Sequence, residues 1–323
     1  MLGLMPELIE QIGPSVHTSW QQWKWDRSAC VELAVAASQG RSAGGGLKLR
    51  IAFLVNRDVE SNLTLNFLLP EIHESTVGIF LSERVGSGRK VPRMLGQLAL
   101  IEQDFFNALA PGLIGSSDQV SSGHRFGFAE LQQRFGVPVR VLPSLRDPAG
   151  LQMLQDAGAD LFISIRFGQI LKNEALAIPP RGVLNLHSGL LPQYRGVLAT
   201  FRALLNGDPE IGCTLHWIDS PGIDVGRIIE TARVAVEKER SLLWHILSLY
   251  QPGARLIMNA IRRLERDEPM TGTSQDPSAG VYYSFPGEDD LMQFTTLGWR
   301  LFDREDVWDL FESYGFPLRI SAP

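Results

Sequence analysis

From residue 49 onward, short apolar runs alternate with segments whose apolar residues recur at helical spacing. Residues 50–55 are typical of a central strand buried on both faces, and residues 62–72 carry leucine and isoleucine at the spacing of a helix. Repetition of strand and helix predicts an α/β fold with a mostly parallel sheet and helices on both faces. The site should then lie outside the carboxyl ends of the strands. The other strands are expected at 77–81, 137–142, 161–165, 182–186, 212–218 and 227–236, and the other helices at 94–109, 126–135, 173–177, 199–206, 241–266 and 305–314.

The pattern divides the chain into three parts. We expect an N-terminal extension at 1–47, a catalytic domain at 48–236, and a C-terminal helical extension at 237–323 packed on that domain. The first part contains a tryptophan cluster (Trp20, Trp23 and Trp25), and its glycine-rich end is typical of a flexible connector. In the last part, residues 282–286 are expected to form a loop.

Composition limits the class of protein. A net charge of -6 argues against a nucleic-acid binder that works by neutralising phosphates. The two cysteines, Cys30 and Cys213, fit reduced thiols and have no metal-binding spacing. No signal peptide begins the sequence, and no apolar run approaches the length of a membrane span. We therefore expect a soluble cytoplasmic protein that binds no nucleic acid, membrane or metal; its oligomeric state is left open.

The candidate reaction centre consists of Asn185, His187 and Asp224. Residues two apart on a strand face the same side, so the first two side chains meet near the carboxyl end of their strand. An amide donor beside an imidazole suits a developing negative oxygen. A carboxylate from the later loop could orient the imidazole and favour its charged form. Either His187 or Asp224 alone is usually structural, but the combination predicts oxyanion binding and proton transfer.

The order and spacing of these residues resemble the folate-dependent formyltransferase family, over about residues 49–236. The resemblance is carried by Asn185-Leu186-His187, Leu190-Leu191-Pro192, Tyr194-Arg195-Gly196, Gly212-x-Thr214 and Asp224-x-Gly226. It implies a Rossmann-like enzyme that passes a formyl group from 10-formyltetrahydrofolate to a small-molecule amine, without a metal. It also implies that Asn185, His187 and Asp224 are catalytic.

The resemblance further implies which residues bind the folate. The first group follows the strand before the catalytic one, where flat apolar walls suit a pterin ring. The implied contacts are Phe167, Gly168, Gln169, Ile170, Leu171, Gly189, Leu190, Leu191, Pro192 and Ile223. Two features depart from the family pattern. A serine hydroxyl expected at position 189 is replaced by glycine, and the loop before Asp224 is one residue longer.

The acceptor is predicted from sequence outside the motif. Residues 49–323 are most similar to the hydroxyornithine transformylases of pyoverdine-type siderophore biosynthesis, through residues 166–170, 199–207, 212–219 and 240–245. A hydroxylamine nitrogen is less basic than an alkyl amine and stays nucleophilic at neutral pH, which fits a site without an extra base. The turn at 56–62 lacks the glycines of an early phosphate cradle, and residues 237–323 have neither the strands nor the charge of a tRNA-binding module.

Two alternatives remain open from the sequence. The acceptor could be a nucleotide-linked amino sugar, with Tyr282, Tyr283 or Phe285 stacking on the base. The protein could also bind folate without catalysis, although an intact catalytic trio argues against this. His216 and His245 are expected to be structural.

Overall fold

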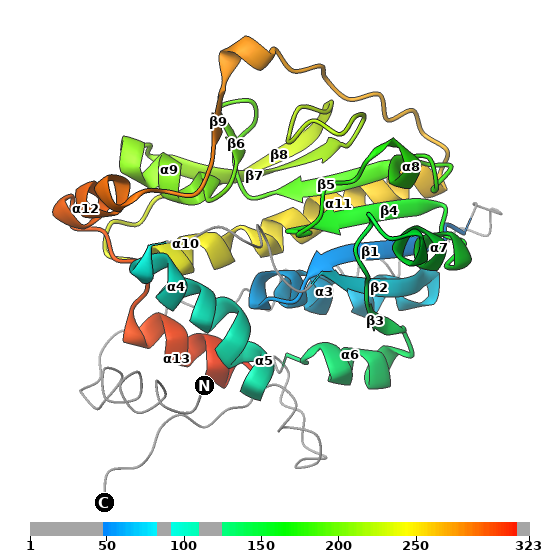
Figure 1. Cartoon of the computed structure of the whole chain (residues 1–323), viewed down its shortest axis with the longest axis horizontal. Coiled ribbons are helices and arrows are strands. Elements are labelled where there is room, and N and C mark those ends of the chain that lie inside the picture. The colour runs from blue at the N-terminus through cyan, green and yellow to red at the C-terminus, as the bar shows by residue number, and fades with distance from the viewer. Residues whose placement is uncertain (1–47, 83–91, 110–124, 315–323) are drawn as a thin grey trace, which may run out of the picture. The chain divides into compact units, whose positions relative to one another are not determined.

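The computed structural model describes residues 48–82, 92–109 and 125–314, so the predicted extension at 1–47 lies outside the described residues. Seven strands form one sheet in the order β3-β2-β1-β4-β5-β7-β8 (Figure 1). Strands β1 to β5 pair with one another in parallel, whereas β7 runs antiparallel to both β5 and β8, which confirms the mostly parallel sheet. The strands are β1 (Ile51–Asn56), β2 (Thr76–Ser82), β3 (Val139–Val141), β4 (Leu161–Ile165), β5 (Val183–His187), β7 (Glu210–Trp217) and β8 (Ile228–Ala235).

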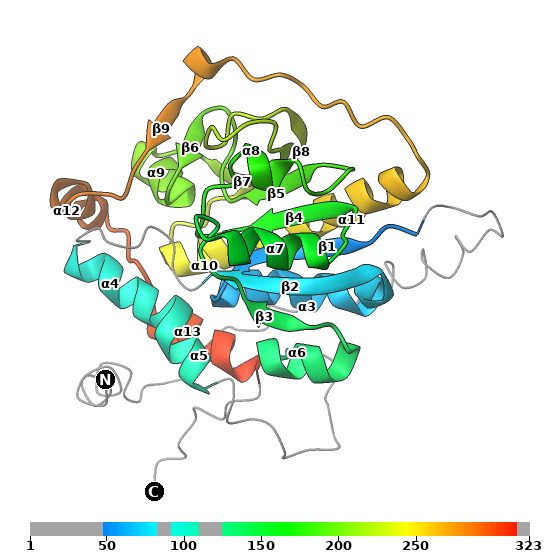
Figure 2. The same cartoon turned by 45° about the vertical axis from the view of Figure 1, so that its right-hand side comes forward.

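The alternation of side chains along β1 explains why helices cover both faces. Ile51, Phe53 and Val55 join one apolar cluster, whereas Ala52 and Leu54 join another. The first cluster includes residues of α3 (Val59–Ile72) and α11 (Tyr250–Glu265), and the second includes residues of α7 (Pro148–Asp156) and α8 (Asn173–Leu176) (Figure 2). Every residue of β1 is buried, as expected for a strand covered on both sides.

Several helices differ in detail from the prediction. The helix expected at 94–109 is interrupted by a π-helix, Leu100–Phe105, between α4 (Arg93–Ala99) and α5 (Phe106–Leu109). The helix expected at 241–266 consists of α10 (Leu242–Ser248) and α11, which meet at Leu249. Helices α6 (Phe128–Phe135), α9 (Ala199–Asn206) and α13 (Arg304–Glu312) lie where expected, whereas α7 and α12 (Glu288–Thr296) were not predicted. Short 3-10 helices occupy His73–Ser75 and Pro277–Ala279.

The prediction of a loop at 282–286 is wrong in part. Residues Val281–Tyr283 form β9, which pairs in parallel with β6 (Tyr194–Gly196) in a separate two-stranded sheet. Three residues are too few to show an alternating pattern, and the partner strand is distant in sequence. Neither strand can therefore be recognised from the sequence alone. The predicted division of the chain at residue 236 stays a prediction.

Candidate active site

Strand pairing brings Asn185 and a second histidine together. Strand β5 runs antiparallel to β7, with Asn185 opposite His216 and His187 opposite Thr214. The Nδ2 atom of Asn185 lies 3.0 Å from Nε2 of His216. Against the expectation that it is only structural, His216 therefore lies in the site. Its position depends on the β5–β7 register, which the sequence does not specify.

Asp224 lies between the two imidazoles. Its Oδ2 atom is 3.5 Å from Nδ1 of His187, and its Oδ1 atom is 3.6 Å from Nε2 of His216. The backbone N–H of Gly196 donates to Oδ2 at 2.8 Å. The carboxylate is only 10% exposed. The three predicted catalytic residues thus come together at the carboxyl end of β5, with His216 as a fourth member.

Backbone carbonyls orient both rings. Nε2 of His187 is 2.6 Å from the Tyr194 oxygen, and Nδ1 of His216 is 2.8 Å from the Trp217 oxygen. A carbonyl can only accept, so each of these nitrogens carries a proton. The remaining nitrogen of His216, Nε2, faces both the Asn185 amide and the Asp224 carboxylate: without a proton it accepts from Asn185, and with a proton it donates to Asp224. His187 instead directs its other nitrogen at Asp224 and can pair with it as an imidazolium.

The electrostatics favour an ionised aspartate. Burial of Asp224 opposes ionisation, but the charge of His187, the hydrogen bond with His216 and the Gly196 N–H together lower the pKa of Asp224 to about 2. A carboxylate of that pKa is a weak base at neutral pH. Asp224 therefore suits the stabilisation of a positively charged imidazole better than permanent removal of a proton from substrate.

The first group of predicted folate contacts follows β4, and it is firmly anchored. Gly168 donates its N–H to Oγ of Ser82 at 2.8 Å. The Gln169 amide accepts from the Leu145 N–H at 2.7 Å and donates to the Pro143 oxygen at 3.2 Å. The side-chain amide of Gln169 thus holds the neighbouring loop. Hydrogen bonds from Gln169 to a ligand would therefore come from its backbone.

Only some of the predicted folate contacts are open to a ligand. Ile170 is 59% exposed and Ile223 is 41% exposed, and both present apolar surface. Leu171 and Leu191 are each 5% exposed and belong to the interior, whereas Phe167 packs partly buried against an apolar cluster. Contact of these residues with folate stays a prediction, as it does for Gly168, Leu190 and Pro192.

The structure explains why position 189 carries glycine. A Cβ atom there would collide with Ala199 and would lie 2.8 Å from Nε2 of His187 and 3.0 Å from the Tyr194 oxygen. The turn is also held by Thr214, whose Oγ1 donates to the Gly189 oxygen at 2.7 Å. No side chain fits at this position unless its neighbours move, so the missing hydroxyl is a consequence of local packing.

Introducing at position 189 the serine of the family pattern should damage the site. We expect Gly189→Ser to reduce the rate of the reaction by about 10²-fold, because displacing a catalytic group by about 1 Å can have that effect. Gly96→Ala in α4 is the matched control, since its added Cβ meets nothing within 4 Å. Steady-state rates and thermal unfolding of both variants would be compared with the wild type. Equal rates for Gly189→Ser and the wild type would contradict this account of position 189.

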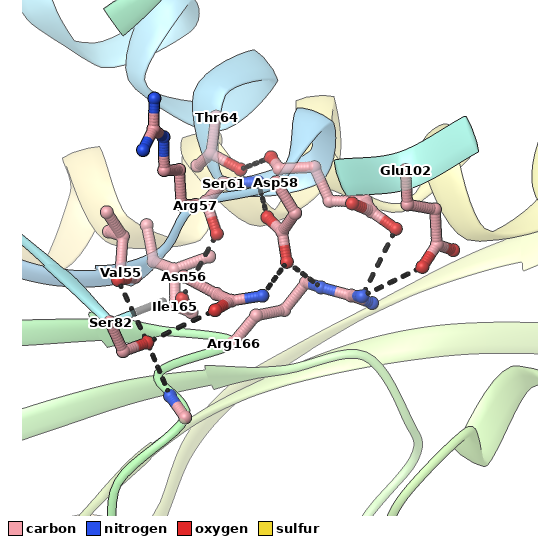
Figure 3. A network of polar contacts seen from close by, with 12 residues as sticks. Val55, Asn56, Arg57, Asp58, Ser61, Thr64, Ser82, Glu102, Ile165 and Arg166 are labelled. Atoms are coloured by element: carbon pink, nitrogen blue, oxygen red, sulfur yellow. Dashed lines mark hydrogen bonds and ion pairs between the residues drawn. The ribbon is translucent and has the colours of Figure 1, made fainter. Parts of the chain in front are cut away.

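A buried ion network lies at the carboxyl ends of β1 and β4 (Figure 3). Arg166 donates from Nε to Asp58 at 2.8 Å, and one terminal nitrogen is 3.3 Å from both Glu60 and Glu102. Asp58 also caps α3 by accepting from the Ser61 N–H at 2.9 Å. All three carboxyl groups are buried. The network fixes Arg166, which has a φ of 53° and leads directly into the predicted folate loop.

Three carboxyl groups share one guanidinium in this network. Burial raises the pKa of Glu60 well above its usual value and also raises the pKa of Glu102. The network therefore places three buried acidic groups around one guanidinium.

Within the described residues, no group of three or more histidine, cysteine, aspartate or glutamate side chains is placed to hold a metal ion. In the same ranges, no helix has the length and apolar character needed to cross a membrane.

Comparison with known proteins finds similarity in the part of the chain that contains the candidate site. Residues 130–245 match the model of the formyl transferase family. The methionyl-tRNA formyltransferase of Burkholderia ambifaria (strain MC40-6) is 38% identical over 157 residues, covering 46% of this chain and 47% of that protein. The same enzyme of Synechococcus sp. (strain JA-3-3Ab) is 37% identical over 153 residues, covering 47% of each chain. This chain thus spans about half the length of the curated relatives it matches.

The solved structures that resemble this one are more distant. An N-formyltransferase from Helicobacter canadensis, in complex with folinic acid and dTDP-3-aminofucose, aligns with a TM-score of 0.49 and 16% identity, covering 75% of this chain and 72% of that one. Asn185, His187 and Asp224 thus all lie within the segment that matches the model of the formyl transferase family.

Proposed function

We propose that the protein transfers a formyl group from 10-formyltetrahydrofolate to an amine or hydroxylamine nitrogen. The observation that carries the proposal is the Asp224 carboxylate held between His187 and His216, beside the amide of Asn185. An oxyanion formed at the formyl carbon is stabilised by a hydrogen-bond donor and a nearby positive charge, which the Asn185 amide and an imidazolium paired with Asp224 would supply.

The proposed reaction begins when the acceptor nitrogen attacks the formyl carbon. Asn185 Nδ2–H donates to the oxyanion, the positive charge of protonated His187 stabilises it electrostatically, and Asp224 balances the charge on His187. The nitrogen that formed the new bond loses a proton, and the departing folate nitrogen gains one as the C–N bond to folate breaks. Because Asp224 is a weak base, this proton passes between the two nitrogens through His187 or water, with Asp224 balancing the charge.

We further propose that the acceptor is N-hydroxyornithine. The turn after β1 is poorly suited to binding a phosphate group, and this favours an acceptor that places no phosphate there. The N–H groups that begin a helix can bind phosphate, but at the start of α3 the buried Asp58 carboxyl group already accepts from the Ser61 N–H and places an acidic group there. Glu60 and Glu102 add acidic groups nearby. A neutral hydroxylamine nitrogen would attack without first losing a proton.

The amino-sugar alternative depends on an aromatic platform near the site. Tyr283 stacks on Tyr194, with ring centroids 6.0 Å apart, and the guanidinium of Arg202 lies 5.0 Å from the centroid of its ring. Tyr283 is therefore used in packing. Tyr282 is 48% exposed and is the aromatic residue of β9 that is open to a base.

One assay separates these possibilities. The purified full chain would be incubated with 10-formyltetrahydrofolate and, in turn, N-hydroxyornithine, ornithine, a dTDP-linked amino sugar and methionyl-tRNA, and release of tetrahydrofolate would be recorded. We expect turnover with N-hydroxyornithine and at least tenfold less with the others. Preference for the amino sugar or the tRNA would overturn the acceptor. Folate binding without turnover of any acceptor would favour a binding protein instead.

A further inference from the structure

We propose that residues 273–287, here called the C-terminal strap, position both Asp224 and His187, and that Gln275 is the positioning residue for Asp224. The inference rests on the proposed formyl transfer and extends it to residues outside the matched segment at 130–245. Figure 1 shows the chain leaving α11, passing the sheet on the side of β8 and descending through β9 to α12.

The first contact is made by the side chain of Gln275. Its Nε2 atom donates to the backbone oxygen of Asp224 at 3.1 Å and to that of Gly226 at 2.5 Å. One amide thus holds the carbonyls on both sides of Val225. Asp224 itself has a φ of 55°, in the left-handed region that a non-glycine residue adopts only when its surroundings hold it there. Gln275 supplies part of that restraint.

The second contact is the pairing of β9 with β6. The Val281 N–H donates to the Gln193 oxygen at 3.1 Å, and the Val197 N–H donates to the Tyr283 oxygen at 2.9 Å. The guanidinium of Arg195 also donates to the Gly280 oxygen at 3.2 Å. Strand β6 has β9 as its partner in this sheet, so the strap determines where β6 lies.

Strand β6 in turn contacts both side chains of the catalytic ion pair. Its Gly196 N–H donates to the Asp224 carboxylate, and its Tyr194 oxygen accepts from His187. The approach of the two strands is close, because a Cβ at Gly196 would collide with the Tyr283 oxygen. The strap therefore reaches Asp224 twice, through its backbone and through its carboxylate, and it reaches His187 through Tyr194.

Gln275→Glu tests this inference because it keeps the size of the side chain and removes both amide protons. The loss of two ordinary hydrogen bonds, together with an acceptor facing two carbonyls, should lower kcat roughly tenfold or more. The dissociation constant for folate should change less than twofold. Ser278→Ala is the matched control, because its exposed hydroxyl contacts only Asp276 within the strap; we expect wild-type kcat for this variant.

A second readout does not depend on activity. The imidazole nitrogen chemical shifts of His187 and His216 report their hydrogen bonds, and we expect both to move in Gln275→Glu but not in Ser278→Ala. Wild-type kcat together with unchanged imidazole shifts in Gln275→Glu would overturn the strap inference. Lack of transferase activity in the wild-type protein would instead overturn the proposed function, and the imidazole shifts would still decide whether the strap positions the pair.

Discussion

Replacing Asp224 with asparagine is expected to reduce formyl transfer by about 10²–10⁴-fold, the range over which general acid-base assistance contributes to catalysis. The amide keeps the size of the side chain but removes the negative charge that faces His187 and His216. The pKa of Asp224 is lowered to about 2, so the wild-type group is ionised throughout the neutral range and its charge is what the substitution removes. The rate would be measured as tetrahydrofolate release at saturating acceptor.

Asp219→Asn provides the control for this prediction. Asp219 precedes the same loop and is also ionised, since its hydrogen bond with Arg227 lowers its pKa, but it is 37% exposed and pairs with Arg227, and the charge of His216 has only a smaller effect on its pKa. We expect this variant to retain most of the wild-type rate. Similar losses in both variants would mean that the loop, not the charge of Asp224, matters for transfer.

The elements that could be predicted from sequence are those with a strong local pattern. The buried run of β1 and the helical spacing of α9 each specify their own structure. Asn185 and His187 could be paired because two residues separated by one position share a face of any strand. Asp224 required the family resemblance, because a turn aspartate has no periodicity.

What the sequence could not predict depends on contacts between distant segments. His216 reaches Asn185 only through the antiparallel register of β5 and β7. Strands β6 and β9 are too short to show alternation, and each is stabilised by the other. The Arg166 network joins residues from α3, a π-helix and the end of β4. In each case the information lies in the pairing of elements that are distant in sequence.

Replacing Arg166 with methionine is expected to cause the largest loss of stability of any single change in the described network. The guanidinium is the cation shared by Asp58, Glu60 and Glu102, and its removal leaves buried carboxyl groups without a positive partner. Breaking a buried ion pair by removing one partner destabilises a protein by about 3–5 kcal/mol. Urea unfolding would measure the loss.

The control is Arg233→Met, which removes an arginine that pairs with Glu210 on the surface, where the two side chains are 57% and 48% exposed. Such exposed pairs contribute about 0.2–1 kcal/mol, so this variant should unfold close to the wild type. A loss for Arg166→Met no larger than for Arg233→Met would contradict the role assigned to the network.

A double variant separates charge from packing. In Arg166→Met with Glu60→Gln, one of the stranded carboxyl groups becomes a neutral amide. Because burial raises the pKa of Glu60, the charged form of this side chain is disfavoured at its site, and a neutral amide should be tolerated there once Arg166 is gone. We therefore expect the double variant to be more stable than Arg166→Met alone. If instead the two substitutions simply added their losses, the cost of removing Arg166 would lie in lost packing around its side chain and not in unbalanced charge.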